Sequence, residues 1–391
     1  MTLKIRPAHS ADQHRLTAIL HRSKASWGYP EEKMENFRCA FRLTAKDIER
    51  GVFLVAERDG QPVGFAGGFA RGETFCLYYL FIAPEATTQG IGRLLLTRIE
   101  DQARIQGVKR LKLESDHFAA PFYVRQGFEQ TGTRPSPMSP TGAIPVFERR
   151  LSGPAFPLKS IKLKMSTEAD WGFEQSNESA ISAHWQDVTR KNPHLWNGRT
   201  LKVTDLNFQD GHLNGTCQES SFAAFLAWRD WGFPSLATYN LFGSAVLRCS
   251  DGALVFGVMA DHTANPGKIY PPGGSLEPSD INPDTGEIEV LGSIFRELEE
   301  ETGMTSADVT HTDTTAIFFG PMISVAAILE VNETAETVRE NILQHSFATE
   351  EKELKDAVIL RSQADLTQPG LQPWAKAIAK AILPIGQPQN A

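Results

Sequence analysis

The sequence predicts an α/β protein of the α+β kind, built from two domains. Its 391 residues exceed the length of about 250 to 300 at which a single hydrophobic core usually stops growing. In both halves of the chain, short strand-like runs alternate with stretches of helical periodicity. The composition is that of a folded globular protein, with 41% hydrophobic and 22% charged residues and no low-complexity tract.

Charge and hydropathy exclude several classes of function. The net charge is -8, and the 39 lysines and arginines are scattered, so we expect no nucleic-acid partner. No apolar run approaches the about 18 residues of a membrane span, so no membrane association is expected. The start, MTLKIRPAHSADQH, lacks the apolar core of a secretory signal. We therefore expect a cytoplasmic protein.

The cysteines indicate neither a zinc site nor a disulfide framework. They are far apart in the chain and form no Cys-x-x-Cys pair. The four positions are Cys39, Cys76, Cys217 and Cys249. We predict buried free thiols.

The first half of the chain opens with strands and helices in alternation. Residues 3–8 alternate as in a strand, and a helix follows, with Ser10 as its predicted N-cap. The runs VFLVAERDG and QPVGFAGGFA meet at Asp59-Gly60, a dipeptide typical of hairpin turns. TFCLYYLFIAPE and RLKLES are further predicted strands, and AAPFYVRQGF is predicted to be helical.

A glycine-bearing loop, TTQGIG, lies between a predicted strand and an amphipathic helix. Gly90 and Gly92 would let the backbone approach a ligand closely. The N–H groups of the first turn of the helix would attract phosphate. Taken alone, the spacing is equally compatible with an ordinary tight turn.

In the order of its elements, this half of the chain resembles the GNAT family of acyl-CoA-dependent N-acetyltransferases. The family signature, Q/R-x-x-G-x-G/A after a strand, is matched by residues 87–92, with Thr87 at the first position. The resemblance covers residues 1–151 and implies a GNAT fold with a mixed sheet. It also implies that acetyl-CoA is a co-substrate held mainly by backbone N–H groups. The residues in question are Gln89, Gly90, Ile91, Gly92 and Arg93.

A second landmark of the family, F-Y-x-x-x-G-F, is matched by residues 122–128. By this resemblance Tyr123 would protonate the departing CoA thiolate, a role that a phenol near the sulfur can fill. The alternative is a tyrosine that packs in the core. Residues 27–34 and 132–151 are also similar to a GNAT subgroup, but the amine that would accept the acetyl group is not indicated.

Residues 152–170 are predicted to be a linker, because they lose periodicity and contain glycine, prolines and lysines. Their IKLKM run could instead form a strand of the second domain. The second domain is then residues 171–391, with an N-terminal subdomain at 171–237 and a core at 238–391.

The core contains two strand-like runs around Asp251-Gly252 and, later, an amphipathic helix that we expect to end at Gly303. On this helix three carboxylates stand at i, i+3 and i+4: Glu297, Glu300 and Glu301. Like charges at this spacing repel one another, so the run is either a solvated face or the holder of a cation. No lysine occurs between 269 and 351, and oxygen ligands of this kind suit Mg²⁺ or Mn²⁺.

Residues 296–304 match every fixed position of R-E-U-x-E-E-x-G-U, the second half of the Nudix box. The resemblance implies an α/β/α sandwich that hydrolyses a diphosphate with Mg²⁺ or Mn²⁺. Glu297, Glu300 and Glu301 would ligate the metal, Gly274 would offer its carbonyl oxygen, and Arg296 would brace the cluster by an ion pair. Glu299 falls at a free position of the motif.

The first half of the box is less regular. Gly274 and Asp280 have the family spacing, with Asp in place of Glu, and an insertion of about eight residues follows before Arg296. A general base is sought among Glu350, Glu351 and Glu353. Residues 185–199 and 222–231 are similar to a Nudix branch that includes UDP-sugar pyrophosphatases. The tryptophans of this region, Trp196, Trp228 and Trp231, would either stack on a ligand or build the subdomain core.

The sequence therefore predicts a bifunctional enzyme. Its substrates would be a nucleoside diphosphate derivative, either an NDP-sugar or a dinucleotide, and acetyl-CoA with an unknown amine. The alternative is that one or both domains bind such ligands as sensors without turnover. The oligomeric state stays open, and a homodimer is compatible with the sequence.

Overall fold

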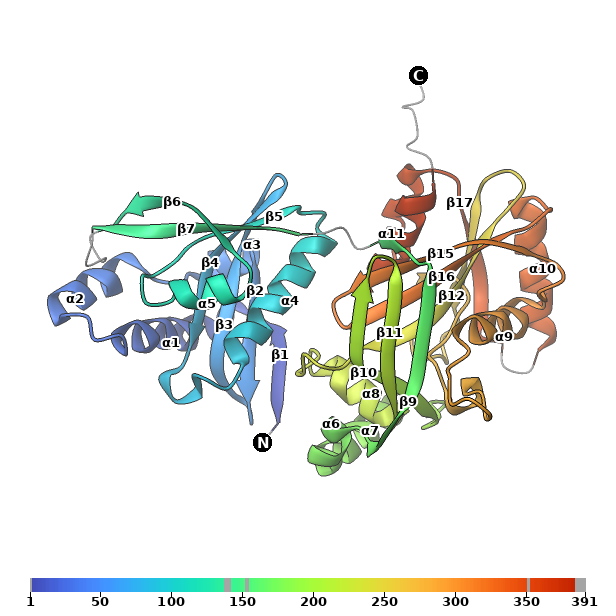
Figure 1. Cartoon of the computed structure of the whole chain (residues 1–391), viewed down its shortest axis with the longest axis horizontal. Coiled ribbons are helices and arrows are strands. Elements are labelled where there is room, and N and C mark those ends of the chain that lie inside the picture. The colour runs from blue at the N-terminus through green and yellow to red at the C-terminus, as the bar shows by residue number, and fades with distance from the viewer. Residues whose placement is uncertain (1, 137–141, 152–154, 350–351, 384–391) are drawn as a thin grey trace, which may run out of the picture. The chain divides into compact units, whose positions relative to one another are not determined.

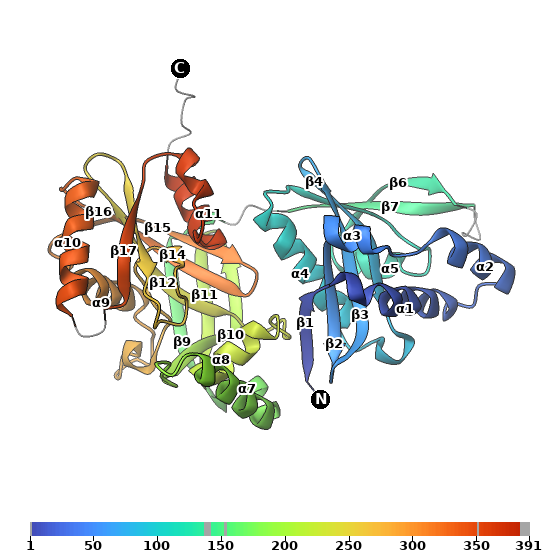
Figure 2. The same ribbon diagram turned by 180° about the vertical axis from the view of Figure 1, so that it is seen from behind.

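The computed structural model describes residues 2–136, 142–151, 155–349 and 352–383. The chain divides into two compact units, Met1–Gly153 with Trp228–Leu236, and Pro154–Ala227 with Ala237–Ala391. Each contains helices and a mixed sheet, which confirms the α/β class (Figures 1 and 2). The segment Trp228–Leu236 folds with the first unit although it lies within the predicted second domain.

The first unit is built on a seven-stranded sheet in the order β1-β2-β3-β4-β5-β7-β6. Neighbouring strands are antiparallel except for β4 and β5, which are parallel. The strands are β1 (Leu3–Pro7), β2 (Val52–Arg58), β3 (Gln61–Arg71), β4 (Thr74–Ile82), β5 (Arg110–Glu114), β6 (Glu129–Pro135) and β7 (Ala143–Arg150).

The predicted hairpin at Asp59-Gly60 is confirmed. Both residues have positive φ, 49° and 78°, as a tight turn between β2 and β3 requires. The parallel ladder between β4 and β5 covers only Thr74–Leu77, so the second half of β4 has no strand partner on that side among the described residues. The last residues of β4 lead directly into the glycine-bearing loop.

Helices flank this sheet, and the longest, α4, follows the glycine-bearing loop. The helices of the first unit are α1 (Gln13–Ala25), α2 (Glu31–Ala40), α3 (Ala45–Arg50), α4 (Ile91–Ile105) and α5 (Ala120–Arg125). The predicted cap at Ser10 is wrong: Asp12 accepts the His9 N–H at 2.8 Å, and Ser10 begins a short 3-10 turn instead. Arg6 holds that Asp12 carboxylate at 2.7 Å, which fixes it in this capping position.

The second unit contains a seven-stranded mixed sheet and a separate three-stranded sheet. In the larger sheet β14-β13-β12-β16-β15-β8 run in that order and β17 pairs with β13; in the smaller the order is β10-β11-β9. The strands of the larger sheet are β8 (Ala155–Pro157), β12 (Asn240–Arg248), β13 (Leu254–Met259), β14 (Ile269–Tyr270), β15 (Thr310–Phe319), β16 (Met322–Glu330) and β17 (Leu354–Leu360). Those of the smaller are β9 (Ser160–Asp170), β10 (Arg199–Gln209) and β11 (His212–Ser221).

Two stretches of special interest in the sequence have regular structure here. Most of the predicted linker, 152–170, lies in β8 and β9. The inserted residues after Asp280 form a small hairpin in which Ile281 pairs with Ile288. This hairpin is tied to β9, because Ile288 donates its N–H to the Leu163 carbonyl at 2.9 Å.

Helix α9 carries the glutamate run. It ends where predicted, with Gly303 in the left-handed conformation at φ 74° and its N–H bonded to the Glu299 carbonyl. The apolar side chains Val290, Ile294 and Leu298 enter the core. The other helices assigned to this unit in whole or in part are α6 (Gly172–Ser176), α7 (Glu178–Lys191), α8 (Phe222–Asp230), α10 (Ala335–Ala348) and α11 (Pro373–Ile382).

All four cysteines are free thiols, as predicted, but they are not all buried: Cys39 is exposed on α2. Trp228 and Trp231 are core residues, whereas Trp196 is 83% exposed. Among the described residues, no helix has the length and apolar character needed to cross a membrane.

Candidate functional site

The loop between β4 and α4 presents a row of backbone N–H groups. Those of residues 88–93 find no hydrogen-bond acceptor among the described residues, and no side chain caps α4. Thr88 and Gly90 have positive φ, 63° and 78°, which turns consecutive N–H groups toward one side. The helix dipole adds a partial positive charge at the same place. The loop is thus chemically suited to an anion such as phosphate.

Side chains hold this loop in position. Thr87 donates its hydroxyl to the Pro84 carbonyl at 2.8 Å. Gln89 donates to the Glu85 carbonyl at 3.2 Å and accepts from Arg58 at 2.6 Å. At Gly92, by contrast, an added Cβ would meet only ordinary contacts, the nearest at 3.7 Å. Of the two loop glycines, Gly90 is therefore required by its backbone conformation.

Tyr123 lies on α5 and is 7% exposed. Its ring packs against Phe122, Phe128 and Phe147, with centroid distances of 5.1, 5.7 and 6.1 Å. Burial raises the pKa of its phenol, so the hydroxyl keeps its proton at neutral pH. No described residue accepts a hydrogen bond from it, so the phenol proton is available to a ligand.

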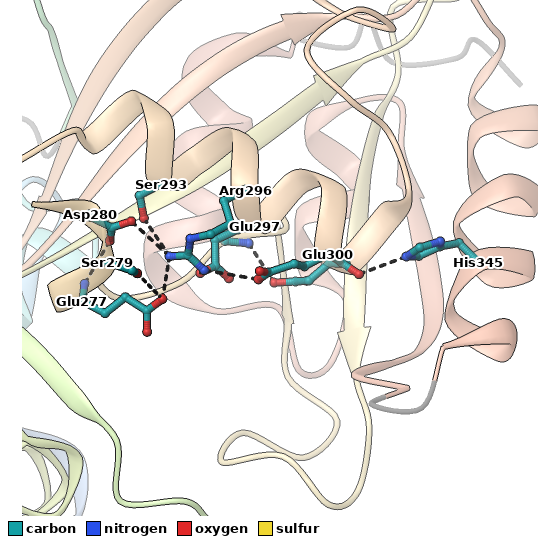
Figure 3. A network of polar contacts seen from close by, with 10 residues as sticks. Glu277, Ser279, Asp280, Ser293, Arg296, Glu297, Glu300 and His345 are labelled. Atoms are coloured by element: carbon teal, nitrogen blue, oxygen red, sulfur yellow. Dashed lines mark hydrogen bonds and ion pairs between the residues drawn. The ribbon is translucent and has the colours of Figure 1, made fainter. Parts of the chain in front are cut away.

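In the second unit, Arg296 lies at the centre of an acidic site (Figure 3). One terminal nitrogen, Nη1, contacts Glu297 at 2.9 Å and Glu300 at 3.2 Å. The other, Nη2, contacts Glu277 at 3.1 Å and Asp280 at 3.2 Å. One cation thus faces four carboxylates, and its charge does not balance theirs.

Asp280 positions Arg296. Its side chain is 3% exposed, and its second oxygen accepts the Glu277 N–H at 2.9 Å, so the carboxylate cannot swing away. The inserted hairpin starts at the next residue. The aspartate therefore keeps a defined place despite the stretched spacing of the motif.

Glu301 points inward from α9 and is 6% exposed. Its Oε1 accepts the Gly273 N–H at 3.0 Å, while its buried Oε2 has no hydrogen-bond partner among the described residues. Burial raises the pKa of this carboxyl group well above its usual range, and Glu353 and Glu297 add to the effect by repulsion. A buried carboxylate oxygen without a partner is costly, so the site favours an added positive charge.

Glu297 lies against the glycine turn before the helix. A Cβ placed on Gly274 would be 2.5 Å from its carboxylate, so a larger residue there would force the Glu297 side chain to move. Burial raises the pKa of Glu297 to about 7, although Arg296 acts in the opposite direction. This cradle and the unpartnered Glu301 oxygen both fit a divalent cation.

The three glutamates do not converge as the spacing suggested. Glu300 is half-exposed and turned toward Arg296, and its carbonyl accepts a hydrogen bond from His345 at 3.0 Å. In the described part of the chain no three His, Cys, Asp or Glu side chains form a ready metal cluster. Of the base candidates, Glu353 raises the pKa of both inward glutamates, whereas Glu350 and Glu351 lie outside the described residues.

A family model described as an acetyltransferase (GNAT) domain matches residues 49–130, which include the β4–α4 loop and Tyr123. An IAA acetyltransferase of Azospirillum brasilense is 36% identical over 104 residues, 24% of this chain and 62% of that protein. An N-acetyltransferase of Bacillus subtilis strain 168, YhfO, described as uncharacterized, is 30% identical over 100 residues, 23% of this chain and 67% of that protein. The chain belongs to the GNAT family. It spans less than two thirds of the length of the first of these relatives.

Solved structures similar to the chain include two acetyltransferases. The PaiA N-acetyltransferase of Thermoplasma acidophilum, in complex with coenzyme A, is 22% identical, with a TM-score of 0.35; the similarity covers 39% of this chain and all 100% of that one. A GCN5-related N-acetyltransferase of Rhodopseudomonas palustris is 23% identical, with a TM-score of 0.33, covering 39% and 97%.

In the GNAT unit the sequence motifs include the loop and the tyrosine but not Arg58, which reaches the loop from β2. In the acidic site they do not include Glu277 or the Gly273 N–H. None of these residues belongs to a motif of regular spacing. Each acts through a contact with a residue that lies elsewhere in the sequence. Only the two acidic residues at 277 and 280 offered a sequence signal.

Proposed function

We propose that the GNAT unit is an acetyl-CoA-dependent N-acetyltransferase. The row of unpaired N–H groups at residues 88–93 carries this proposal, because it suits the pyrophosphate of CoA. Gln89, Gly90, Ile91, Gly92 and Arg93 are the proposed contact residues. The IAA acetyltransferase of Azospirillum brasilense supports the same reaction class.

Tyr123 is the proposed general acid of this reaction. The amine nitrogen of the acceptor attacks the thioester carbonyl, the carbon–sulfur bond breaks, and the phenol donates its proton to the departing thiolate. The nitrogen releases its extra proton to water as the amide forms, and the phenolate takes a proton back from water, so that CoA leaves as a thiol and the tyrosine is restored. A raised pKa keeps the phenol protonated until that moment. Its aromatic neighbours hold the ring in place on α5.

Two measurements test the proposal. Calorimetric titration with acetyl-CoA should show binding to the full chain, and CoA release should be observed when a panel of small amines is added. No detectable binding of acetyl-CoA would refute the acetyltransferase assignment. Binding without turnover on a broad panel would favour an acyl-CoA sensor.

For the second unit we propose a Mg²⁺- or Mn²⁺-dependent Nudix hydrolase that cleaves the diphosphate of an NDP-sugar or dinucleotide. The observation that carries it is the buried Glu301 oxygen without a partner beside a second carboxylate whose pKa is raised. Such groups occur where a cation is expected to bind. The proposed ligands are Glu297, Glu300, Glu301 and the Gly274 carbonyl.

When bound, such a metal lowers the pKa of an attacking water and neutralises charge on phosphate oxygens. The residues of the chain itself prepare the site for it. Arg296 orients Glu297 and Glu300, while the Gly273 N–H fixes one oxygen of Glu301 and leaves the other available. Glu353 is the proposed base, since its charge already acts on both inward glutamates.

A substrate panel tests the hydrolase proposal. NDP-sugars, dinucleotides and CoA are incubated with the full chain and Mg²⁺, and mononucleotide release is measured with and without a chelator. We expect release from at least one compound and its loss on chelation. Binding of a nucleotide sugar without any cleavage would instead indicate a sensor.

A further inference from the structure

The first position of the GNAT signature holds an uncharged side chain in this protein. Thr87 stands where Gln or Arg is usual, and its hydroxyl proton is already used by the Pro84 carbonyl at 2.8 Å. This side chain therefore brings neither a charge nor a free proton to a phosphate. Backbone N–H groups remain, but they carry only partial charges, whereas CoA carries three phosphate groups.

A cation reaches the same loop from another strand. Arg58, at the end of β2, donates one N–H to the side chain of Gln89 at 2.6 Å. It makes no ion pair and no second side-chain hydrogen bond with the described residues. Its guanidinium group is thus held at the loop with most of its donors available.

Two neighbouring arginines, unlike Arg58, are paired with carboxylates. Arg22 also reaches the loop, but Glu85 neutralises it at 2.6 Å. Arg6 lies in β1, the strand that pairs with β2, and forms ion pairs with Glu57 and Asp12. Arg58, by contrast, has the neutral Gln89 as its only side-chain hydrogen-bond partner within the described part of the chain.

We propose that Arg58 binds a phosphate group of acetyl-CoA and so takes over the role of the Gln or Arg that is usual at position 87. The inference rests on the proposed acetyl-CoA binding of the GNAT unit. Gln89 positions the guanidinium group by accepting one of its N–H groups. The remaining donors match phosphate oxygens in the forked geometry typical of arginine.

The test compares acetyl-CoA with its 3′-dephospho derivative, which lacks one phosphate group. Dissociation constants are measured by calorimetry for the wild type, Arg58→Ala and Arg58→Lys. Arg71→Ala is the matched control. Arg58 pairs with Gln61 at the start of β3, whereas Arg71 is an exposed arginine at the end of β3. Melting temperatures show whether each variant is folded.

We expect Arg58→Ala to weaken acetyl-CoA binding about 10-fold or more, as loss of a charged hydrogen bond implies, with Arg58→Lys less affected and Arg71→Ala unchanged. A loss confined to acetyl-CoA assigns the 3′-phosphate, and an equal loss for both compounds assigns the pyrophosphate. Wild-type affinity of Arg58→Ala would overturn the inference, as would an equal loss in Arg58→Lys. A wild type that fails to bind acetyl-CoA would instead refute the proposed function.

Discussion

The two candidate sites of this chain are built from different chemical groups, backbone N–H groups in one and carboxylates in the other. In the first unit, the loop at 88–93 offers uncharged backbone N–H groups, held in place by Thr88 and Gly90 at positive φ. In the second, helix α9 offers carboxylates, two of which are turned inward and have raised pKa values. Under the proposed functions, the first site receives negative charge and the second receives positive charge.

The contrast explains why the two motifs tolerate change differently. A backbone site survives substitution of side chains, so Thr87 can replace the usual residue while the N–H groups stay available. A carboxylate site depends on each side chain, and the half of its motif that lies in α9 is matched at every fixed position, although Asp280 replaces Glu in the other half. The identity of a residue is therefore informative in α9, whereas backbone conformation is informative in the loop.

We expect the largest effect on activity when a buried glutamate of α9 is replaced and compared with an exposed one. Glu301→Gln replaces the buried carboxylate oxygen that has no partner among the described residues, so the proposed metal-dependent hydrolysis should fall at least about 100-fold. Glu299→Gln is the control, because Glu299 is exposed on the same helix. Mononucleotide release in Mg²⁺ is the measurement, and equal rates in the two variants would contradict the assignment of Glu301.

Tyr123→Phe tests the proposed general acid of the first site. Loss of the proton donor should lower kcat for acetyl transfer about 100-fold and leave the dissociation constant of acetyl-CoA nearly unchanged. Stopped assays of CoA release and calorimetry provide the two values. Parallel losses in both would identify Tyr123 as a packing residue.

Gly90→Ala probes the backbone itself. At φ 78° an alanine is strained by about 1 to 2 kcal/mol, so the loop should shift and acetyl-CoA should bind about 5- to 10-fold more weakly. Gly72→Ala is the matched control, since Gly72 has φ 57°, lies in the β3–β4 turn and has open space around it. Equal affinities in the two variants would show that the conformation of Gly90 does not matter for binding.

A smaller effect concerns stability in the second unit. Burial lowers the pKa of Lys202 from 10.5 to about 7, although Cys217 and Glu174 act in the opposite direction. Above this value the folded state loses the proton that the unfolded state keeps until about pH 10.5, so stability should rise with pH across this window. The slope has an upper limit of about 1.4 kcal/mol per pH unit.

Lys202→Met isolates this contribution. Melting temperatures of the wild type and the variant are compared from pH 7 to 10, and the difference between them should change by a few °C, because the methionine does not titrate. In the variant, Asn240 loses the hydrogen bond that it accepts from Lys202 at 2.7 Å. This loss occurs at every pH, so it shifts the melting temperature of the variant by a constant amount. A constant difference between the two curves would mean that the lysine stays charged in the folded protein.

Much of the local structure could be predicted because it depends on neighbouring residues. The turns at Asp59-Gly60 and Gly252 and the end of α9 at Gly303 follow from backbone preferences that each short segment carries by itself. Ser10 shows the limit of such reasoning. A serine is a good cap in isolation, but Ser10 lies inside the 3-10 turn before α1, where the Asp12 carboxylate accepts the His9 N–H and is held by Arg6 of β1.

The sequence by itself determined which chemical groups each site possesses: the glycine loop, the tyrosine and the glutamates at helical spacing. Only the tertiary structure decided how they are used. It buried Glu301 and left Glu300 half-exposed, although both lie on one turn of α9. It also brought Arg58 to Gln89 across 31 residues. Burial and long-range contacts depend on which surfaces pack together, and this information is not contained in the spacing of any single segment.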